Sequence, residues 1–178
     1  RRGFCPSCGA RRMIETSAHL IDHVLPAVPI RQWVLAFPWP LRLLLSTRPE
    51  AVTRVLAIVT RAIETALIRR AGKTRKGGAC GGIVTLIQRF GGSLNLNVHL
   101  HMLVLDGVYA NDHGKLRFQP LPAPAPAMMT QLLDVIVLRV LRCLERDGLL
   151  ISDPEQPWLD LEARDALDAL GAASIQYR

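Results

Sequence analysis

The sequence predicts an α+β fold in which helices pack against an antiparallel sheet of short strands. Two long segments, 49–72 and 128–148, carry apolar residues every three or four positions, as amphipathic helices do. Three shorter segments, 31–37, 83–90 and 96–110, are rich in apolar, aromatic and β-branched residues, which is typical of strands. Glycine, proline and Asp-Gly punctuation separates these segments and allows neighbouring strands to pair.

In the first half of the chain, proline or glycine delimits each predicted element. Residues 13–24 have apolar residues at helical intervals, and the proline-rich stretch that follows ends this helix. A strand at 31–37 comes next, followed by a short helix at 41–45. The long helix at 49–72 has proline at its start and glycine after its last turn. It leads into a basic, glycine-rich loop at 72–82.

In the second half, strands at 83–90 and 96–110 are joined by a glycine-containing turn. The dipeptide Asp106-Gly107 is predicted to form a second turn, with 115–119 as the hairpin partner of the preceding strand. The remaining predicted elements are an extended proline-rich linker, a helix that ends at a glycine, a short helix and a final strand, at 120–127, 128–148, 160–170 and 174–178.

The composition indicates one folded domain with an anionic partner. A chain of 178 residues, 49% hydrophobic and 21% charged, has the size and balance of a soluble globular domain. It contains neither the roughly 20 apolar residues of a membrane span nor a secretory signal, so we expect no membrane partner and a cytoplasmic, bacterial location. The net charge of +7 favours nucleic acid, with general solubility as the alternative. Four unevenly spaced cysteines fit a reducing compartment.

The strongest functional candidates are His99 and His101 in the predicted strand 96–110. Side chains alternate along a strand, so both imidazoles point to one face, where a divalent metal could satisfy them. Alternatively, both are hydrogen-bonded structural residues. A third ligand could come from Gln88 or Asp106. Alternation favours Gln88, since Asp106 is five residues beyond His101 and falls on the opposite face.

Three stretches, CPSCGARR, PIRQWVLAFPWPLR and VTLIQRFGGSLNLNVHLHMLVLDGVY, resemble in the same order the rolling-circle transposases of the IS ninety-one type. These are HUH endonucleases, where U is hydrophobic, and His99, Leu100 and His101 match that signature. The resemblance implies a Rep-like endonuclease core, a variant of the ferredoxin-like fold, over 29–178. It also implies that residues 1–28 are the end of a zinc-binding module with a connecting helix.

The activity that the resemblance implies is nicking and religation of single-stranded DNA at transposon ends. Mg²⁺ or Mn²⁺, held by His99, His101 and a third side chain, would assist attack by a tyrosine that becomes 5′-phosphotyrosine. Tyr109 and Tyr177 are the tyrosines of this chain, and neither shows the helical tyrosine pair typical of the family. Since the chain starts without Met and ends within a predicted strand, we expect a fragment whose nucleophile lies downstream.

Cys5 and Cys8 have the C-x-x-C spacing of half a zinc site. His19 and His23 follow at four-residue spacing, so the four residues imitate a zinc finger with a short loop. The resemblance implies instead that Cys5 and Cys8 complete a Zn²⁺ module whose first ligand pair precedes Arg1. A zinc-dependent DNA-binding module without catalysis is therefore one rival function, and a phosphodiesterase that uses activated water is another.

Basic residues flank the cysteine pair and fill the glycine-rich loop. Those that could follow a phosphate backbone are Arg11, Arg12, Lys73, Arg75 and Lys76. Arg69 and Arg70 lie at the end of a helix, where the macrodipole also explains them. The aromatic residues Trp33, Trp39 and Phe90 could stack on unpaired bases, but the low aromatic content of 5% favours a place in the core.

Overall fold

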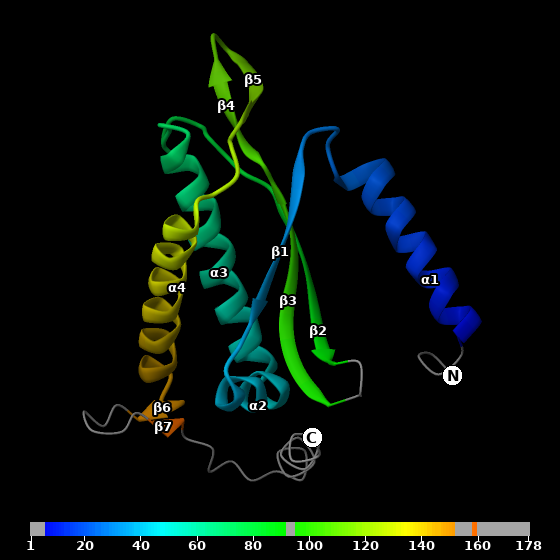
Figure 1. The fold of residues 1–178 in the computed structure, drawn as a ribbon, viewed down its shortest axis with the longest axis vertical. Helices are drawn as coiled ribbons and strands as arrows, with labels where there is room; N and C mark the ends of the chain where they lie inside the picture. Colours follow the sequence, from blue (N-terminus) through cyan, green and yellow to red (C-terminus); the bar gives the residue numbers. More distant parts are fainter. Residues whose placement is uncertain (1–5, 92–94, 152–157, 160–178) are drawn as a thin grey trace.

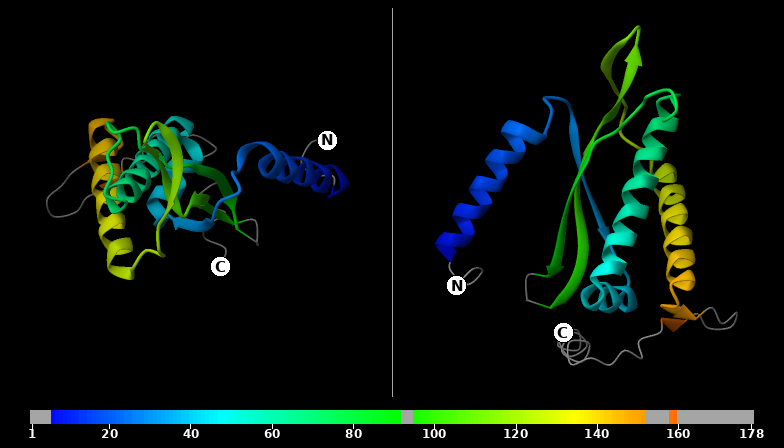
Figure 2. Two further views of the ribbon diagram at one scale, coloured as in Figure 1. Left: turned by 90° about the horizontal axis from the view of Figure 1, so that it is seen from above. Right: turned by 180° about the vertical axis from the view of Figure 1, so that it is seen from behind.

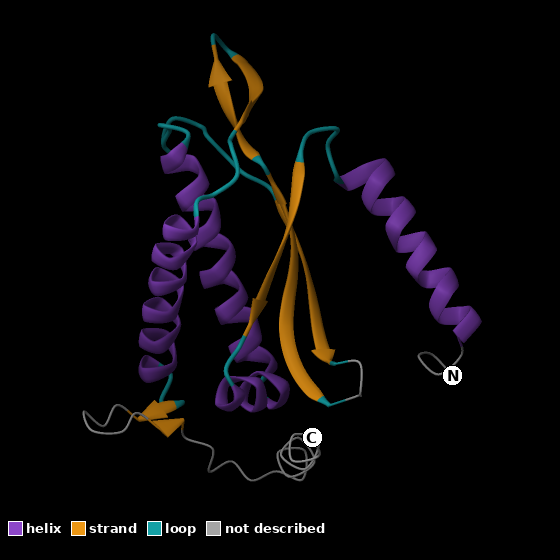
Figure 3. Cartoon of the chain, in the orientation of Figure 1, coloured by secondary structure: helices purple, strands orange, loops and turns teal. Residues whose placement is uncertain are grey.

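The computed structural model describes residues 6–91, 95–151 and 158–159 (Figure 1). Its elements, in chain order, are α1 (Pro6–His19), η1 (Leu20–Val24), β1 (Ile30–Ala36), α2 (Trp39–Thr47), α3 (Pro49–Arg70), β2 (Ile83–Phe90), β3 (Leu96–Leu105), β4 (Gly107–Asp112), β5 (Lys115–Pro120), α4 (Pro126–Arg146), β6 (Leu150–Ile151) and β7 (Trp158–Leu159). Helices and antiparallel strands are both present (Figure 3), which confirms the α+β class.

The main sheet has the strand order β1-β3-β2, and both pairings are antiparallel. The central strand β3 pairs on one side with β1, where Val34 lies opposite His101. On its other side β2 places Gln88 opposite His99 and Leu86 opposite His101. Since residues directly opposite each other share a face of the sheet, all five side chains lie on the same face.

Within the residues that the structure describes, helices cover one face of this sheet. In Figure 2, α2 and α3 lie against the sheet, and α4 packs on α3. The β3 residues that face these helices are Val98, Leu100, Met102 and Val104, and all four are buried with α3 residues such as Val59 and Ile63 in one core. On the opposite face, which we call the open face, Val34 is 58% exposed and Leu86 is 51% exposed. This one-sided core leaves the histidine-bearing face accessible.

The long predicted strand divides at Asp106 into β3 and β4 without a hairpin at that place, so the predicted Asp-Gly turn is wrong. The chain bends at Asp106 without reversing its direction, and there the backbone N–H of Asp106 donates to the Pro29 carbonyl while its own carbonyl accepts from Leu121. β4 then pairs with β5 in a separate two-stranded sheet. Its turn is at His113 and Gly114, whose positive φ angles of 49° and 81° suit a two-residue hairpin.

The N-terminal helix begins at Pro6, earlier than the predicted 13–24. The prediction began too late because the first turns of the helix lack the apolar periodicity on which it relied. It ends as an α-helix at His19 and continues as the π-helix η1. Figure 1 shows it standing apart from the sheet, and its apolar side chains Met13 and Ile14 are exposed.

Two predicted elements, the helix at 160–170 and the strand at 174–178, lie outside the described residues. The division of the chain at residue 28 stays a prediction. Among the described helices, none combines the length and apolar character that crossing a bilayer requires.

Candidate metal centre

The two histidines lie side by side at the middle of the open face. Their ring centroids are 4.8 Å apart and the ring planes make an angle of 63°. Both side chains are half-buried, although their neighbours along β3 are fully buried on the helix side. The alternation of β3 therefore brings the two imidazoles together, as predicted from their spacing. The structure adds that both are only half-buried.

A backbone contact determines which nitrogen of His99 can bind a metal. Nδ1 of His99 lies 2.5 Å from the carbonyl oxygen of Asn97. A carbonyl can only accept, so Nδ1 must carry the proton and donate. In the neutral ring, Nε2 then has a free lone pair. This is the usual arrangement for a metal-binding histidine, in which the other ring nitrogen is held by a carbonyl.

His101 is held from the neighbouring strand instead. Its Nδ1 lies 3.0 Å from Nε2 of Gln32 in β1. In this orientation the amide donates to Nδ1, and the neutral ring carries its proton on Nε2. Turning the amide by 180° would let its oxygen accept from Nδ1–H, which frees Nε2 for a metal. Gln32 was missed in the sequence, although alternation along β1 already places it on the face of Val34.

Gln88 and Asp106, the two proposed third ligands, have different surroundings. Gln88 lies opposite His99, and its side-chain nitrogen donates to the Phe90 carbonyl over 2.9 Å. Its side-chain oxygen accepts no hydrogen bond from the described residues. Both carboxylate oxygens of Asp106 accept from Arg31, at 3.0 and 2.9 Å. Asp106 is therefore occupied as the partner of a bidentate ion pair.

Asn97 adds an oxygen that sequence reasoning overlooked. It precedes His99 by two positions on β3 and so shares the open face. Its side-chain oxygen is buried and has no hydrogen-bond partner among the described residues. An unpartnered buried oxygen is costly, so a cation or an ordered water is expected beside it. The same alternation that singled out the histidines could have found it.

No third His, Cys, Asp or Glu joins the pair within the part of the chain that the structure describes. The donor set on the open face is thus two imidazoles with amide oxygens. Imidazole is a common ligand for divalent ions, and carbonyl-type oxygens suit Mn²⁺ and Mg²⁺. These donor types suit a divalent ion such as Mn²⁺ or Mg²⁺, which His99, His101 and the amide oxygens would hold.

The candidate zinc ligands are only partly described. Cys5 lies outside the described residues, and Cys8 is on α1. The rings of His19 and His23 are 5.4 Å apart at the α1–η1 junction, and both are exposed. The histidines of the zinc-finger hypothesis therefore lie together, at a distance from the main core.

Of the two tyrosines considered as nucleophiles, the structure describes Tyr109 but not Tyr177. Tyr109 is on β4, outside the main sheet, and its ring packs against Phe118 at 5.2 Å. Its environment is that of a structural residue. Tyr177 lies outside the described residues.

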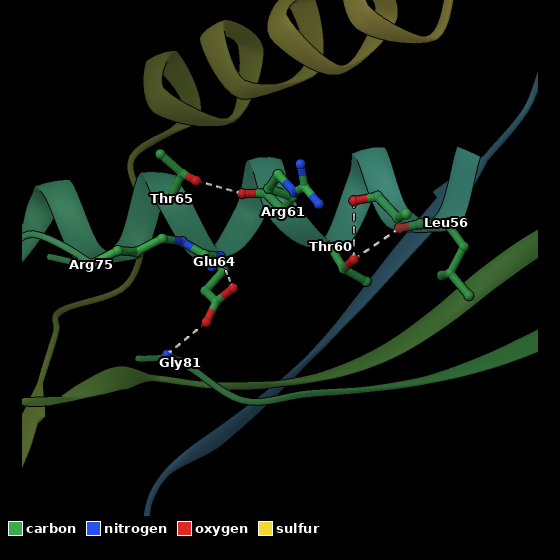
Figure 4. Close-up of polar contacts among 8 residues, drawn as sticks. Leu56, Thr60, Arg61, Glu64, Thr65, Arg75 and Gly81 are labelled. Atoms are coloured by element: carbon green, nitrogen blue, oxygen red, sulfur yellow. Dashed lines mark hydrogen bonds and ion pairs between the residues drawn. The ribbon is translucent and has the colours of Figure 1, made fainter. Parts of the chain in front are cut away.

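The predicted DNA-binding residues fall in two places. In the N-terminal helix, Arg11 pairs with Glu15 at 2.9 Å. In the glycine-rich loop, Arg75 pairs with Glu64, whose second oxygen accepts from the Gly81 backbone at 3.2 Å (Figure 4). Glu64 thus ties the loop to α3 and neutralises Arg75. The other residues of the set, Arg12, Lys73 and Lys76, are exposed.

The aromatic residues divide between core and surface. Trp33 is buried on the helix side of β1. Trp39 is 45% exposed and Phe90 is 51% exposed, so the expected place in the core is wrong for these two. Both lie at the ends of elements, where the sheet and its helices no longer cover them.

Comparison with known families places the histidine pair in a recognisable segment. Residues 82–167 match the family described as "Putative transposase". A search of curated proteins and a search of solved structures each found no match. The matched segment contains His99, His101 and Gln88. This similarity supports a transposase, with a function in DNA transposition.

Proposed function

We propose that this protein is a rolling-circle transposase that nicks and religates single-stranded DNA at a divalent metal held by His99, His101 and Gln88. The observation that carries the proposal is the pair of imidazoles on the open face, 4.8 Å apart, with the His99 Nε2 left free by the Asn97 carbonyl. The resemblance to HUH endonucleases and the transposase family match support it.

Each residue of the site has a separate task. His99 and His101 would bind Mn²⁺ or Mg²⁺ through Nε2, with side-chain oxygens of Gln88 and Asn97 on the same face. The bound ion would act as a Lewis acid on the scissile phosphate. Gln32 orients the His101 ring, since its amide contacts Nδ1 at 3.0 Å. The open face leaves room for a DNA strand to lie across β3.

The bond exchange needs no cofactor that stores energy. A tyrosine oxygen attacks the phosphorus, a phosphotyrosine bond forms, and the bond to the 3′ oxygen breaks. The phenolic proton ends on the released 3′-hydroxyl, so atoms and charge balance. The reverse reaction with another 3′-hydroxyl rejoins the strand. Since Tyr109 packs against Phe118, we propose a nucleophile beyond the described residues.

Basic residues would hold the DNA near this site. Arg11, Arg12, Lys73, Arg75 and Lys76 are proposed as phosphate contacts, and release of Arg75 from Glu64 would be required for its part. Zn²⁺ at Cys5 and Cys8 is proposed for the N-terminal module.

A manganese titration tests the metal site directly. Calorimetry on the whole chain should show binding that is lost in His99→Ala/His101→Ala and weakened in Gln88→Ala. His113→Ala is the matched control, because this histidine is exposed at the hairpin tip. Equal binding by all variants would make the pair structural and refute the proposed metal centre.

The rival phosphodiesterase has one observation in its favour, the packing of the Tyr109 ring against Phe118 in the separate β4–β5 sheet. End-labelled single-stranded DNA and Mn²⁺ distinguish the two reactions. A DNA–protein adduct that survives denaturation indicates tyrosine attack. Cleavage without an adduct, and without loss in Tyr177→Phe, indicates activated water.

The non-catalytic zinc module is favoured by the adjacent rings of His19 and His23. Measuring bound zinc in Cys5→Ser/Cys8→Ser and in His19→Ala/His23→Ala addresses it. Zinc lost in both variants, with no manganese bound at His99, would favour this rival over the transposase.

A further inference from the structure

A groove between α3 and α4 is lined by arginines that the metal site does not use. Its volume is about 470 Å³. The arginines come from both helices and are Arg54, Arg61, Arg139, Arg142 and Arg146. In Figure 4, Arg61 projects from α3 on the side of α4, whereas Glu64 points to the strand segment at Gly81. The groove is therefore separate from the open face of the sheet.

Within the described part of the chain, only part of this charge is neutralised. Asp147 forms ion pairs with Arg54 and, at 3.8 Å, with Arg146. The hydrogen bond from Arg54 lowers the pKa of Asp147 below its ordinary value, so this carboxylate stays ionised. The guanidinium groups of Arg61, Arg139 and Arg142 have no acidic partner among the described residues. These three positive charges repel one another, and an external anion bound between them would remove this repulsion.

The positive stretch continues along the helices. A neighbouring groove, towards the end of α3, is lined by Arg69, Arg70 and again Arg139. Arg70 is used internally, since it donates to the Ala123 carbonyl at 3.0 Å. Arg61 and Arg69 are eight residues apart on α3, which corresponds to about 12 Å at 1.5 Å per residue. A ligand that follows this stretch must carry several negative charges over such distances.

We propose that the groove between α3 and α4 binds the phosphate backbone of duplex DNA, at a site distinct from the histidine face. Arginine suits phosphate oxygens because its planar guanidinium can donate two hydrogen bonds at once. The lining residues other than arginine are Ala57, Ile58 and Cys143, and none is aromatic.

Proteins that hold single strands generally stack the bases on aromatic side chains. The arginine-lined groove offers charge without stacking, so it fits a duplex whose bases are already paired. The inference rests on the proposed function in one respect, namely that the anion is DNA. It assigns the two sides of the molecule different tasks: the open face takes the reacting strand, and the helix side takes adjoining duplex.

The test is binding of a fluorescent duplex of arbitrary sequence to the whole chain, measured by anisotropy over a range of NaCl concentrations. We expect Arg61→Gln/Arg139→Gln to weaken binding roughly tenfold or more at 0.1 M salt. The salt slope should become less negative by about 1.8, or about 0.9 for each phosphate that is no longer neutralised. Lys115→Gln/Arg117→Gln is the control, because it removes two charges from the β4–β5 hairpin, away from the groove.

A second measurement uses the wild-type protein, so its outcome cannot be explained by a variant that fails to fold. Phenylglyoxal modifies accessible arginines, and peptide mapping should show Arg61, Arg139 and Arg142 protected by duplex. Unchanged affinity and slope, an equal loss in the control, or absent protection would each overturn the proposal. Polyglutamate that displaces the duplex and protects the same arginines more strongly would also overturn it, in favour of an acidic protein partner.

The histidine variants separate this inference from the metal proposal. His99→Ala/His101→Ala should retain duplex affinity and its salt slope. If duplex affinity is lost together with the histidines, the DNA lies on the open face and the groove assignment is wrong. If manganese binding is absent but duplex binding depends on Arg61 and Arg139, the groove stands and the metal proposal fails.

Discussion

At the scale of single residues, the candidate metal centre depends on which ring nitrogen carries a proton. The Asn97 carbonyl holds the proton of His99 on Nδ1. His101 has no such backbone partner among the described residues and depends on the Gln32 side chain from another strand. A substitution in β1 should therefore affect which nitrogen of His101 carries the proton, and should leave the proton of His99 in place.

Replacing Gln32 tests this dependence. Gln32→Leu removes the partner of His101 Nδ1, and manganese affinity should fall about 10- to 100-fold, the usual range for an outer partner of a metal-binding histidine. Gln32→Glu should restore or raise the affinity, because a carboxylate accepts from Nδ1–H and leaves Nε2 free. Calorimetry on both variants measures the effect, and equal affinities would show that Gln32 does not orient the ring.

The lowered pKa of Asp147 predicts that the stability of the protein depends on pH. Its pKa is lowered in the folded protein, chiefly by the hydrogen bond from Arg54, so folding favours the ionised form. The resulting stabilisation is fully present above the unfolded pKa of about 3.9 and is lost as the pH falls through the folded value.

Urea unfolding of the wild type and of Asp147→Asn should therefore differ most above about pH 5 and converge in strong acid. Glu145→Gln is a suitable control, since this neighbouring carboxylate is exposed. A difference between wild type and Asp147→Asn that is independent of pH would contradict the role of the charge.

At the scale of elements, β3 and β4 follow each other across a bend at Asp106 and belong to two different sheets. The main sheet ends where Asp106 is fixed by Arg31 and by the backbone of Pro29. β4 continues from there to a hairpin, and the Cys80 and Tyr109 backbones exchange hydrogen bonds of 2.9 and 2.8 Å alongside it. The junction needs a residue without a side chain, and Gly107 occupies it.

Gly107→Ala should destabilise the junction. A Cβ there would overlap the Gln119 carbonyl oxygen and lie 2.5 Å from the Phe118 ring, and the first of these atoms is backbone. Overpacking of this kind costs about 1–3 kcal/mol in the free energy of unfolding, measurable by urea denaturation. Gly9→Ala has open space around the new methyl group and should cause no loss. Equal stability of Gly107→Ala and wild type would show that the backbone around Gln119 and the Phe118 ring can move to accommodate the methyl group at little cost.

At the scale of the whole molecule, the sheet has one face for folding and one for function. The helix side of β3 is sealed by α2 and α3, whereas the open face carries the histidines and exposed apolar side chains. The arginine-lined groove is formed on a third side, between α3 and α4. Substitutions on these sides should therefore separate stability from binding.

Two leucines allow a matched comparison. Leu100→Ala on the buried side should lower the free energy of unfolding by about 2–5 kcal/mol, because it removes buried apolar atoms and leaves a cavity. Leu86→Ala on the open face, where the side chain is 51% exposed, should cost less than about 1 kcal/mol. Chemical denaturation measures both, and similar losses would mean that the open face is covered in solution.

Local sequence patterns determined much of this protein. Periodicity predicted α3, β2 and α4 well, and strand alternation put His99 and His101 on one face, whereas the place of Gln88 opposite His99 also depends on the register of β2 against β3. Local patterns failed where a distant contact decides the outcome. Asp106-Gly107 resembles a hairpin turn, but the chain only bends there, and the Asp106 backbone bonds instead to Pro29 and Leu121.

Tertiary structure alone decided the contacts between elements. Gln32 reaches His101 only because β1 returns beside β3, and Asp106 is engaged because Arg31 lies opposite the end of that strand. The arginine-lined groove exists because antiparallel packing of α3 and α4 brings together Arg61 and Arg139, which are far apart in the chain. Alternation and periodicity describe the faces of one element, whereas a site between elements depends on which faces the fold brings together.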